Sequence, residues 1–183
     1  MVDAISLLYR LKLDCCESPL ESYWSGIVKS YSERKNDHGY IFNDSHIAMM
    51  ISACDNDNEK CLFQISLADY LKINSETSPN AKNYLKQLNA EYAEKIFNAI
   101  FHFDNGEFSK VVEILYPIRY EIIKIGGSNA QRDIFQQMLI QSALRSDSKD
   151  HYKIGLHLLN ERISLKPNSN LTKRIVTRFV NKH

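Results

Sequence analysis

The sequence has little of what marks a membrane-embedded or secreted protein. No apolar run approaches the roughly 18 residues that a membrane-spanning helix needs. The apolar N-terminal stretch is interrupted by charged side chains, so it lacks the core of a signal peptide. These side chains are Asp3, Arg10, Lys12 and Asp14. We therefore predict a cytoplasmic location and no membrane partner.

An excess of one charge is also missing. The 183 residues carry 23 basic and 22 acidic side chains, which gives a formal charge of +1. A chain with so little net charge has no overall field that would hold nucleic acid. The last predicted helix carries several lysines and arginines, but a capping helix with a solvated face explains them more simply. We predict no nucleic-acid partner.

Cysteine is too scarce and too irregularly spaced for a disulfide framework or a metal site. The four cysteines lie at positions 15, 16, 54 and 61. Neither they nor His38 and His46 show the C-x-x-C or H-x-x-x-H spacing of metal ligands. A chain of this length, 44% hydrophobic, can bury a core without disulfides. We predict reduced cysteines, no metal and no other cofactor.

Helical periodicity is what the sequence does contain, along nearly its whole length. Apolar residues recur at steps of three and four, and no segment alternates as a half-buried strand would. Turn and cap residues separate these segments, and Pro117 should kink the helix that contains it. The pattern predicts one all-α domain over residues 1–183. We expect about nine helices, at residues 3–14, 18–32, 44–54, 58–73, 80–103, 107–124, 129–146, 149–164 and 169–181.

Two successive helix pairs repeat at an offset of 44 residues. The second pair ends in Leu-x-Pro-Asn at 165–168, an ending typical of a tetratricopeptide repeat. Gly155 and Ala143 are small residues where such a repeat brings two helices together, whereas Arg162 stands where a small residue is usual. The pattern favours a right-handed α-α superhelix, a solenoid of stacked antiparallel helix pairs. The register aligns Ala99 with Ala143, Phe108 with Tyr152, and Leu115 with Leu159.

Five strings extend this likeness beyond a generic repeat: SLLYRLKLD, FNDSHIAMM, LYPIRYEIIKIGGS, IGGSNAQRDIF and ERISLKPNS. In this order they resemble the tetratricopeptide repeat protein 38 family. The resemblance implies an α-solenoid and a cytosolic location, and it carries over no established enzymatic activity. Family members are longer, and their C-terminal part matches. The resemblance therefore implies the C-terminal portion of a longer solenoid, whose first helix would expose an apolar face for self-association.

The stretch IGGSNAQRD, residues 125–133, predicts a helix end followed by a helix start. Gly126 can adopt the left-handed conformation that ends a helix. Ser128 is a good N-cap, and Gln131 completes a capping box three residues later. The stretch lacks the lysine and the glycine spacing of a Walker phosphate loop.

Arg132 and Asp133 are not needed for that turn, so they become candidate functional residues. As a structural brace, Arg132 would pair with Glu121 or with Asp133. As a functional pair, Arg119 and Arg132 would clamp a carboxylate or phosphate group, which the guanidinium fork suits. The brace is the commoner fate of such charges.

The string FNDSHIAMM supplies the other candidates. Asn43 or Asp44 is expected to cap a helix, with His46 in its first turn bordering the core. A catalytic role would make His46 a base and Asp44 its orienting partner. Residues two apart on a helix do not face each other, so the sequence favours a structural histidine.

Two functions follow from these observations. The first is a non-catalytic interaction module that binds a protein, peptide or helix on a concave face. The second is an enzyme or small-molecule binder whose polar residues converge on one pocket. The candidate residues for that pocket are Asp44, His46, Arg119, Gln131, Arg132 and Asp133.

Overall fold

The computed structural model describes residues 2–14, 20–31, 38, 40–54, 57–76 and 82–180. Every regular element in these ranges is helical, and none is a strand, so the predicted all-α class is confirmed. The described residues form nine α-helices, a 3₁₀-helix, η1, between α6 and α7, and a π-helix, η2, after α9. Their bounds are α1 Val2–Leu13, α2 Glu21–Tyr31, α3 Ile41–Ala53, α4 Asp57–Glu76, α5 Lys82–Asp104, α6 Phe108–Ile118, η1 Glu121–Ile125, α7 Asn129–Arg145, α8 Lys149–Leu165, α9 Asn170–Ile175 and η2 Val176–Val180.

The helix predicted at 107–124 is in fact two elements. Helix α6 ends at Ile118, a turn follows, and η1 then covers Glu121–Ile125. Pro117 has no N–H for the α-helical ladder and clashes with the preceding turn, so it favours a helix end. The expected kink is thus a break, and the sharper 3₁₀ winding turns the chain toward α7.

Helix α3 begins three residues before its predicted start. Its N-cap is Tyr40, whose side chain makes no capping hydrogen bond. The prediction that Asn43 or Asp44 caps this helix is therefore wrong. Asp44 lies inside the first turn and is buried, because the apolar pair Ile41 and Phe42 extends the helix into the core.

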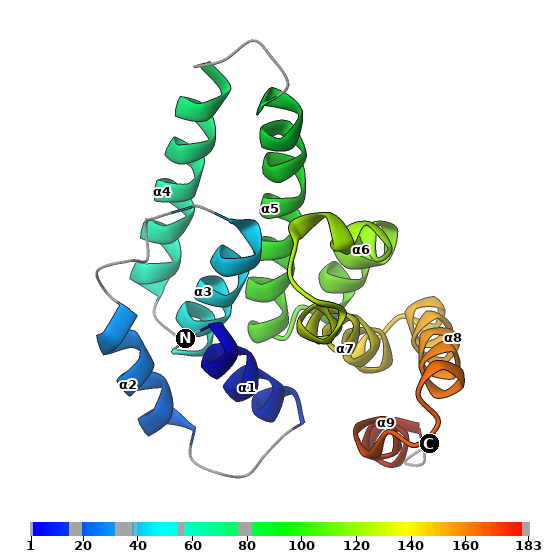
Figure 1. Ribbon diagram of the computed structural model, residues 1–183. Helices are drawn as coiled ribbons and strands as arrows, with labels where there is room; N and C mark the ends of the chain where they lie inside the picture. Colours follow the sequence, from blue (N-terminus) through cyan, green and yellow to red (C-terminus); the bar gives the residue numbers. More distant parts are fainter. Residues whose placement is uncertain are drawn as a thin grey trace.

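The predicted helix pairs are present in the second half of the chain. Helix α5 packs on α6, α6 on α7, and α7 on α8 (Figure 1). A Cβ at Gly155 on α8 would lie 2.9 Å from Leu144 Cδ2 and 3.1 Å from Ala143 Cβ. The close approach predicted at Ala143 and Gly155 is confirmed, since no larger side chain fits there.

The N-terminal helix lies inside the fold. Helix α1 packs against α2, α3 and α7, which surround it in Figure 1. Four of its apolar side chains, namely Ile5, Leu8, Tyr9 and Leu13, are 0–8% exposed, whereas Leu7 is 58% exposed. Other helices of this chain cover these four side chains, so the predicted exposure of an apolar face on the first helix is limited to Leu7. Self-association of the chain stays a prediction, but the burial of most of the apolar face of α1 no longer supports it.

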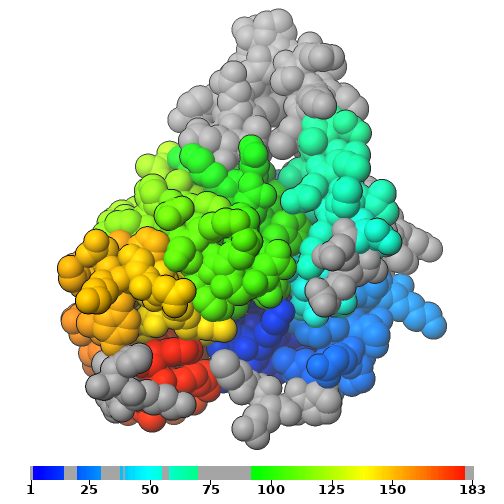
Figure 2. All heavy atoms as spheres, turned by 180° about the vertical axis from the view of Figure 1, so that it is seen from behind, coloured from blue at the N-terminus to red at the C-terminus, as the bar shows by residue number. Residues whose placement is uncertain are grey.

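Polar contacts tie the end of α1 to both α5 and the C-terminal helices. Asp104 at the end of α5 accepts a hydrogen bond from the Tyr9 hydroxyl at 3.1 Å and pairs with Lys12 at 2.9 Å. Arg174 on α9 donates to Asp14 at 3.0 Å. Figure 2 shows the C-terminal residues, in red, beside the blue N-terminal helix.

One cluster of buried apolar side chains runs from Ile5 on α1 to Ile175 on α9. This cluster gives the helices a shared core, as expected when apolar residues recur every three or four positions along each helix. No helix within the described ranges is long and apolar enough to cross a membrane.

Candidate functional site

The loop between η1 and α7 is built as its sequence predicts. Gly126 and Gly127 have positive φ angles of 90° and 74°, which a residue without a Cβ adopts most easily. The Ser128 side chain accepts a hydrogen bond from the Gln131 amide, and the Ser128 amide donates to Gln131 Oε1 at 2.8 Å. The predicted capping box is confirmed. It fixes where α7 begins and so where the following residues point.

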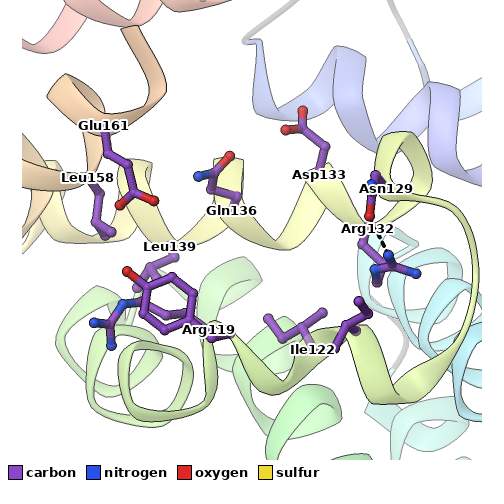
Figure 3. Close-up of a pocket in the computed structure, with 11 residues that line it drawn as sticks. Arg119, Ile122, Asn129, Arg132, Asp133, Gln136, Leu139, Leu158 and Glu161 are labelled. Carbon is purple, nitrogen blue, oxygen red and sulfur yellow. Dashed lines mark hydrogen bonds between the residues drawn. The ribbon is translucent and has the colours of Figure 1, made fainter. Parts of the chain in front are cut away.

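A pocket of about 280 Å³ lies between this loop region and the last long helices (Figure 3). Its residues come from the turn after α6, from η1, from α7 and from α8. We call it the η1–α8 pocket. It is lined by Arg119, Tyr120, Ile122, Ile123, Asn129, Arg132, Asp133, Gln136, Leu139, Leu158 and Glu161.

The apolar part of the pocket has a buried floor and an exposed edge. Ile122, Leu139 and Leu158 are 2–7% exposed and belong to the core. Tyr120 and Ile123 are 66% and 62% exposed. Large apolar side chains standing in water beside a buried floor are typical of a surface that another molecule covers.

Arg119 lies at one end of the pocket, held by two tyrosines. Its guanidinium carbon is 4.0 Å from the Tyr116 ring centroid and 4.3 Å from that of Tyr120. Its Nη1 donates to the Tyr116 carbonyl at 2.6 Å. Within the described part of the chain, the buried Nε has no hydrogen-bond partner. Stacking therefore fixes the cation in place while part of its donor capacity is unused.

Arg132 lies near the loop end of the pocket and pairs with neither predicted partner. Its Nη1 donates to the carbonyls of Gly126, at 2.9 Å, and Gly127, and its Nη2 to Asn129 Oδ1 at 2.5 Å. The predicted brace to Glu121 or Asp133 is therefore wrong. Carbonyl oxygens left free by the glycine turn lie closer to Arg132 than either carboxylate, and they hold its guanidinium against the loop.

Asp133 is the centre of a different brace, one that joins three helices. Its two oxygens accept hydrogen bonds from Arg162 of α8 at 2.6 and 2.9 Å, and Lys166 pairs with it at 2.9 Å. Gln137 Nε2 donates to it at 2.8 Å, and Arg10 of α1 lies 3.7 Å away. In Figure 3 its carboxylate points away from Arg132.

The charge balance at Asp133 has two consequences. Burial by itself raises the pKa of the Asp133 carboxyl, but the hydrogen bonds from Arg162 and Lys166 outweigh burial and lower the pKa well below its ordinary value. Three cations also face this one carboxylate. The cluster of charged side chains around Asp133 therefore has a net positive charge.

Arg162 is the partner of Asp133, and the sequence pattern had identified it only as an unusual residue for its place in the repeat. Its side chain is 2% exposed, and a buried cation requires a counter-charge. Arg162 Nη1 donates to Gln136 at 2.7 Å and its Nε to Thr172 at 3.2 Å, besides the pair with Asp133. An arginine at a position where the repeat needs a small residue could have indicated that a neighbouring helix supplies an acidic partner, which is Asp133.

The other three candidates lie outside the η1–α8 pocket. Gln131 is used by the capping box, and its Nε2 donates to Asp3 of α1 at 3.3 Å. His46 is fully buried in α3, where its Nδ1 donates to the Phe42 carbonyl at 2.8 Å. Burial lowers the pKa of His46, although the hydrogen bond to Phe42 opposes the shift. Asp44 is also buried, and its Oδ1 lies 3.6 Å from His38 Nδ1.

The structure therefore brings together Arg119, Arg132 and Asp133 around one cavity, while Asp44, His46 and Gln131 are not among its lining residues. Of the cysteines considered as metal ligands, Cys15 and Cys16 lie outside the described residues. Cys54 and Cys61 are free and exposed. Among the described residues, no three His, Cys, Asp or Glu side chains lie together as metal ligands do.

Comparison with known proteins identifies no relative by family or by structure: no family model and no solved structure matches the chain.

Proposed function

We propose that this chain is a non-catalytic protein–protein interaction module of the tetratricopeptide repeat type. In this proposal its helix pairs form a right-handed solenoid, and the η1–α8 pocket lies on its concave face. The pocket receives one apolar side chain from a peptide or helix of the partner. The observation that carries the proposal is the exposed pair Tyr120 and Ile123 beside a buried apolar floor.

Size favours a side chain over a whole small molecule. The pocket volume of about 280 Å³ lies just below the range of roughly 300–1,000 Å³ typical of drug-sized ligand sites. It is large enough for a leucine or phenylalanine side chain. Such a side chain, seated in a pocket with its surroundings desolvated, supplies much of the energy of a peptide interface.

Charge favours an acidic segment around that apolar anchor. Arg119 retains unused donor capacity, Arg132 is fixed at the loop end, and the cations around Asp133 outnumber its single charge. Glu161 supplies a carboxylate only at the α8 end of the pocket. A carboxylate next to the apolar residue would therefore meet a guanidinium, a strong and geometrically specific pairing.

The alternative, an enzyme or small-molecule binder with a polar pocket of Asp44, His46, Arg119, Arg132 and Asp133, has weaker support. Two of these residues are absent from the cavity lining, and the Asp133 carboxylate is already engaged by Arg162, Lys166 and Gln137.

The proposal is tested by selecting peptides from a random phage-displayed library on the intact chain and measuring their affinity by fluorescence polarisation. We expect peptides with an apolar residue beside Asp or Glu. Replacing Tyr120 and Ile123 together by serine should weaken binding at least about tenfold, the loss of one hot spot. The matched control is Leu165→Ser, an exposed apolar residue on α8 outside the pocket lining.

Equal loss in the control and the double variant would place binding elsewhere and contradict the proposal. Selection that enriches no peptide would contradict it as well. Arg119→Ala separates the two parts of the argument. If this variant binds the selected acidic peptides as tightly as the wild type, the proposed preference for acidic peptides is wrong, whereas the proposed binding of an apolar side chain in the pocket is unaffected.

A further inference from the structure

Away from the η1–α8 pocket, three side chains from three segments form a serine–histidine–aspartate arrangement. His38 precedes α3, Asp44 lies in the first turn of α3, and Ser66 lies on α4. The Ser66 hydroxyl and His38 Nε2 are 2.8 Å apart, and His38 Nδ1 is 3.6 Å from Asp44 Oδ1. The sequence analysis considered Asp44 as an orienting partner for His46 and did not consider His38.

Burial is graded across these three residues. His38 and Asp44 are 2% and 4% exposed, whereas Ser66 is partly exposed. The imidazole ring lies edge-on to Phe63 at 5.4 Å between centroids, and Phe63 in turn packs on Phe97. The packed side of the imidazole ring therefore faces Phe63, and its Nε2 lies within hydrogen-bond distance of the partly exposed Ser66 hydroxyl.

The backbone at His38 supplies an independent observation. Its φ angle is 38°, and it is the one non-glycine residue with a positive φ among those the structure describes. Such a conformation is unfavourable for a residue with a side chain and persists only where surrounding contacts enforce it. Strained residues of this kind concentrate at reactive positions. Here the strain sets the ring between Ser66 and Asp44.

We propose that Ser66 is an activated nucleophile, with His38 as its base and Asp44 as the positioning carboxylate. The Ser66 oxygen attacks the carbonyl carbon of an activated ester while its proton moves to His38 Nε2. The bond from that carbon to the leaving oxygen breaks, and the leaving group takes the proton from His38. A water molecule then reverses these steps and releases the carboxylic acid.

The geometry also limits the substrate class. The Nδ1 to Oδ1 distance is longer than a hydrogen bond, so Asp44 stabilises the imidazolium by charge at ion-pair range. Ser66 lies in the interior of α4, where backbone N–H groups are committed to the helix and do not form an oxyanion hole. Ser66 should therefore react with electrophiles that are already activated, such as aryl esters and fluorophosphonates, and not with amides.

The test is labelling of the intact chain by a fluorophosphonate probe, with each modified serine mapped and timed by mass spectrometry. Ser164 is the matched internal control. It also lies on a helix, is more exposed than Ser66, and donates only to the Asn160 carbonyl at 3.0 Å. General-base assistance is worth about 10²–10⁴-fold, so we expect Ser66 to label at least about tenfold faster than Ser164.

His38→Gln should reduce labelling of Ser66 to the rate of Ser164, and Asp44→Asn should lower it less. Circular dichroism melts check that each variant folds. Equal rates at the two serines in the wild type would overturn the proposal, and this comparison decides the matter even if His38→Gln does not fold. Unchanged labelling in a folded His38→Gln variant would overturn it too.

Discussion

At the scale of single residues, Asp133 has the largest structural role in the candidate site. It neutralises Arg162, which is almost fully buried, and it links α7 to α8 and α1. Removing one partner of a buried pair leaves the other charge uncompensated in a low-dielectric interior. The carboxylate that the sequence nominated for binding is therefore needed for the shape of the pocket.

Asp133→Asn should lower the free energy of unfolding by about 3–5 kcal/mol, the cost of breaking a buried pair. Urea unfolding followed by circular dichroism measures the change. Asp150→Asn is the control, since Asp150 and Lys153 form an exposed pair at 2.9 Å and such pairs contribute less than about 1 kcal/mol. Equal losses in the two variants would contradict the brace.

His46 should make stability fall as the pH is lowered below its ordinary pKa of 6.5. Burial lowers the pKa of folded His46, so between the two pKa values the unfolded state binds a proton that the folded state excludes. The slope is at most about 1.4 kcal/mol per pH unit. Urea midpoints from pH 7.5 to 5 should show a smaller decline in His46→Gln than in the wild type. Parallel curves would refute this role.

Gln141 is a residue whose replacement should stabilise the protein. It is fully buried, and neither atom of its side-chain amide has a hydrogen-bond partner in the described structure. A buried amide without partners costs about 1–3 kcal/mol. Gln141→Leu should raise the free energy of unfolding by a similar amount in urea titrations. A marked loss of stability would show instead that this amide is satisfied, for example by bound water.

At the scale of elements, the turn from η1 to α7 depends on the fit of Gly127 against α3. A Cβ at Gly127 would lie 2.6 Å from the Phe42 ring, and its φ of 74° disfavours any side chain. This contact holds the loop, and with it Arg132, against α3.

Gly127→Ala should therefore destabilise the protein by about 2 kcal/mol or more, through strain and the clash together. Phe42→Leu removes much of the ring and should recover part of that loss when the two changes are combined. A double-mutant cycle by thermal unfolding measures the recovery. Purely additive effects would show that the ring does not limit position 127.

At this scale, the sequence predicted contacts between residues that are close together in the chain and missed contacts between residues that are far apart. The capping box at Ser128 and Gln131 was predictable because its partners are three residues apart. The break after Pro117 was located, although its form was not. The partners of Arg132 and Asp133 were not predictable, because they depend on where a glycine turn places its carbonyls and on a helix 29 residues downstream.

At the scale of the whole molecule, helix α1 accounts for the largest departure from a simple stack. Arg10 donates to the Ala130 carbonyl at 2.7 Å across a separation of 120 residues. Periodicity reveals which face of α1 is apolar but not which helix covers it. The sequence therefore did not predict that other helices of this chain cover most of the apolar face of α1.

The central claim, that the η1–α8 pocket receives an apolar side chain of a partner, is tested most directly by methyl NMR. A selected peptide is titrated into the chain labelled at isoleucine and leucine methyl groups. The account predicts shifts at Ile122, Ile123, Leu139 and Leu158, which line the pocket, and none at Leu62 and Ile65, which are exposed on α4. Shifts confined to α4, with the four pocket methyl groups unchanged, would contradict it.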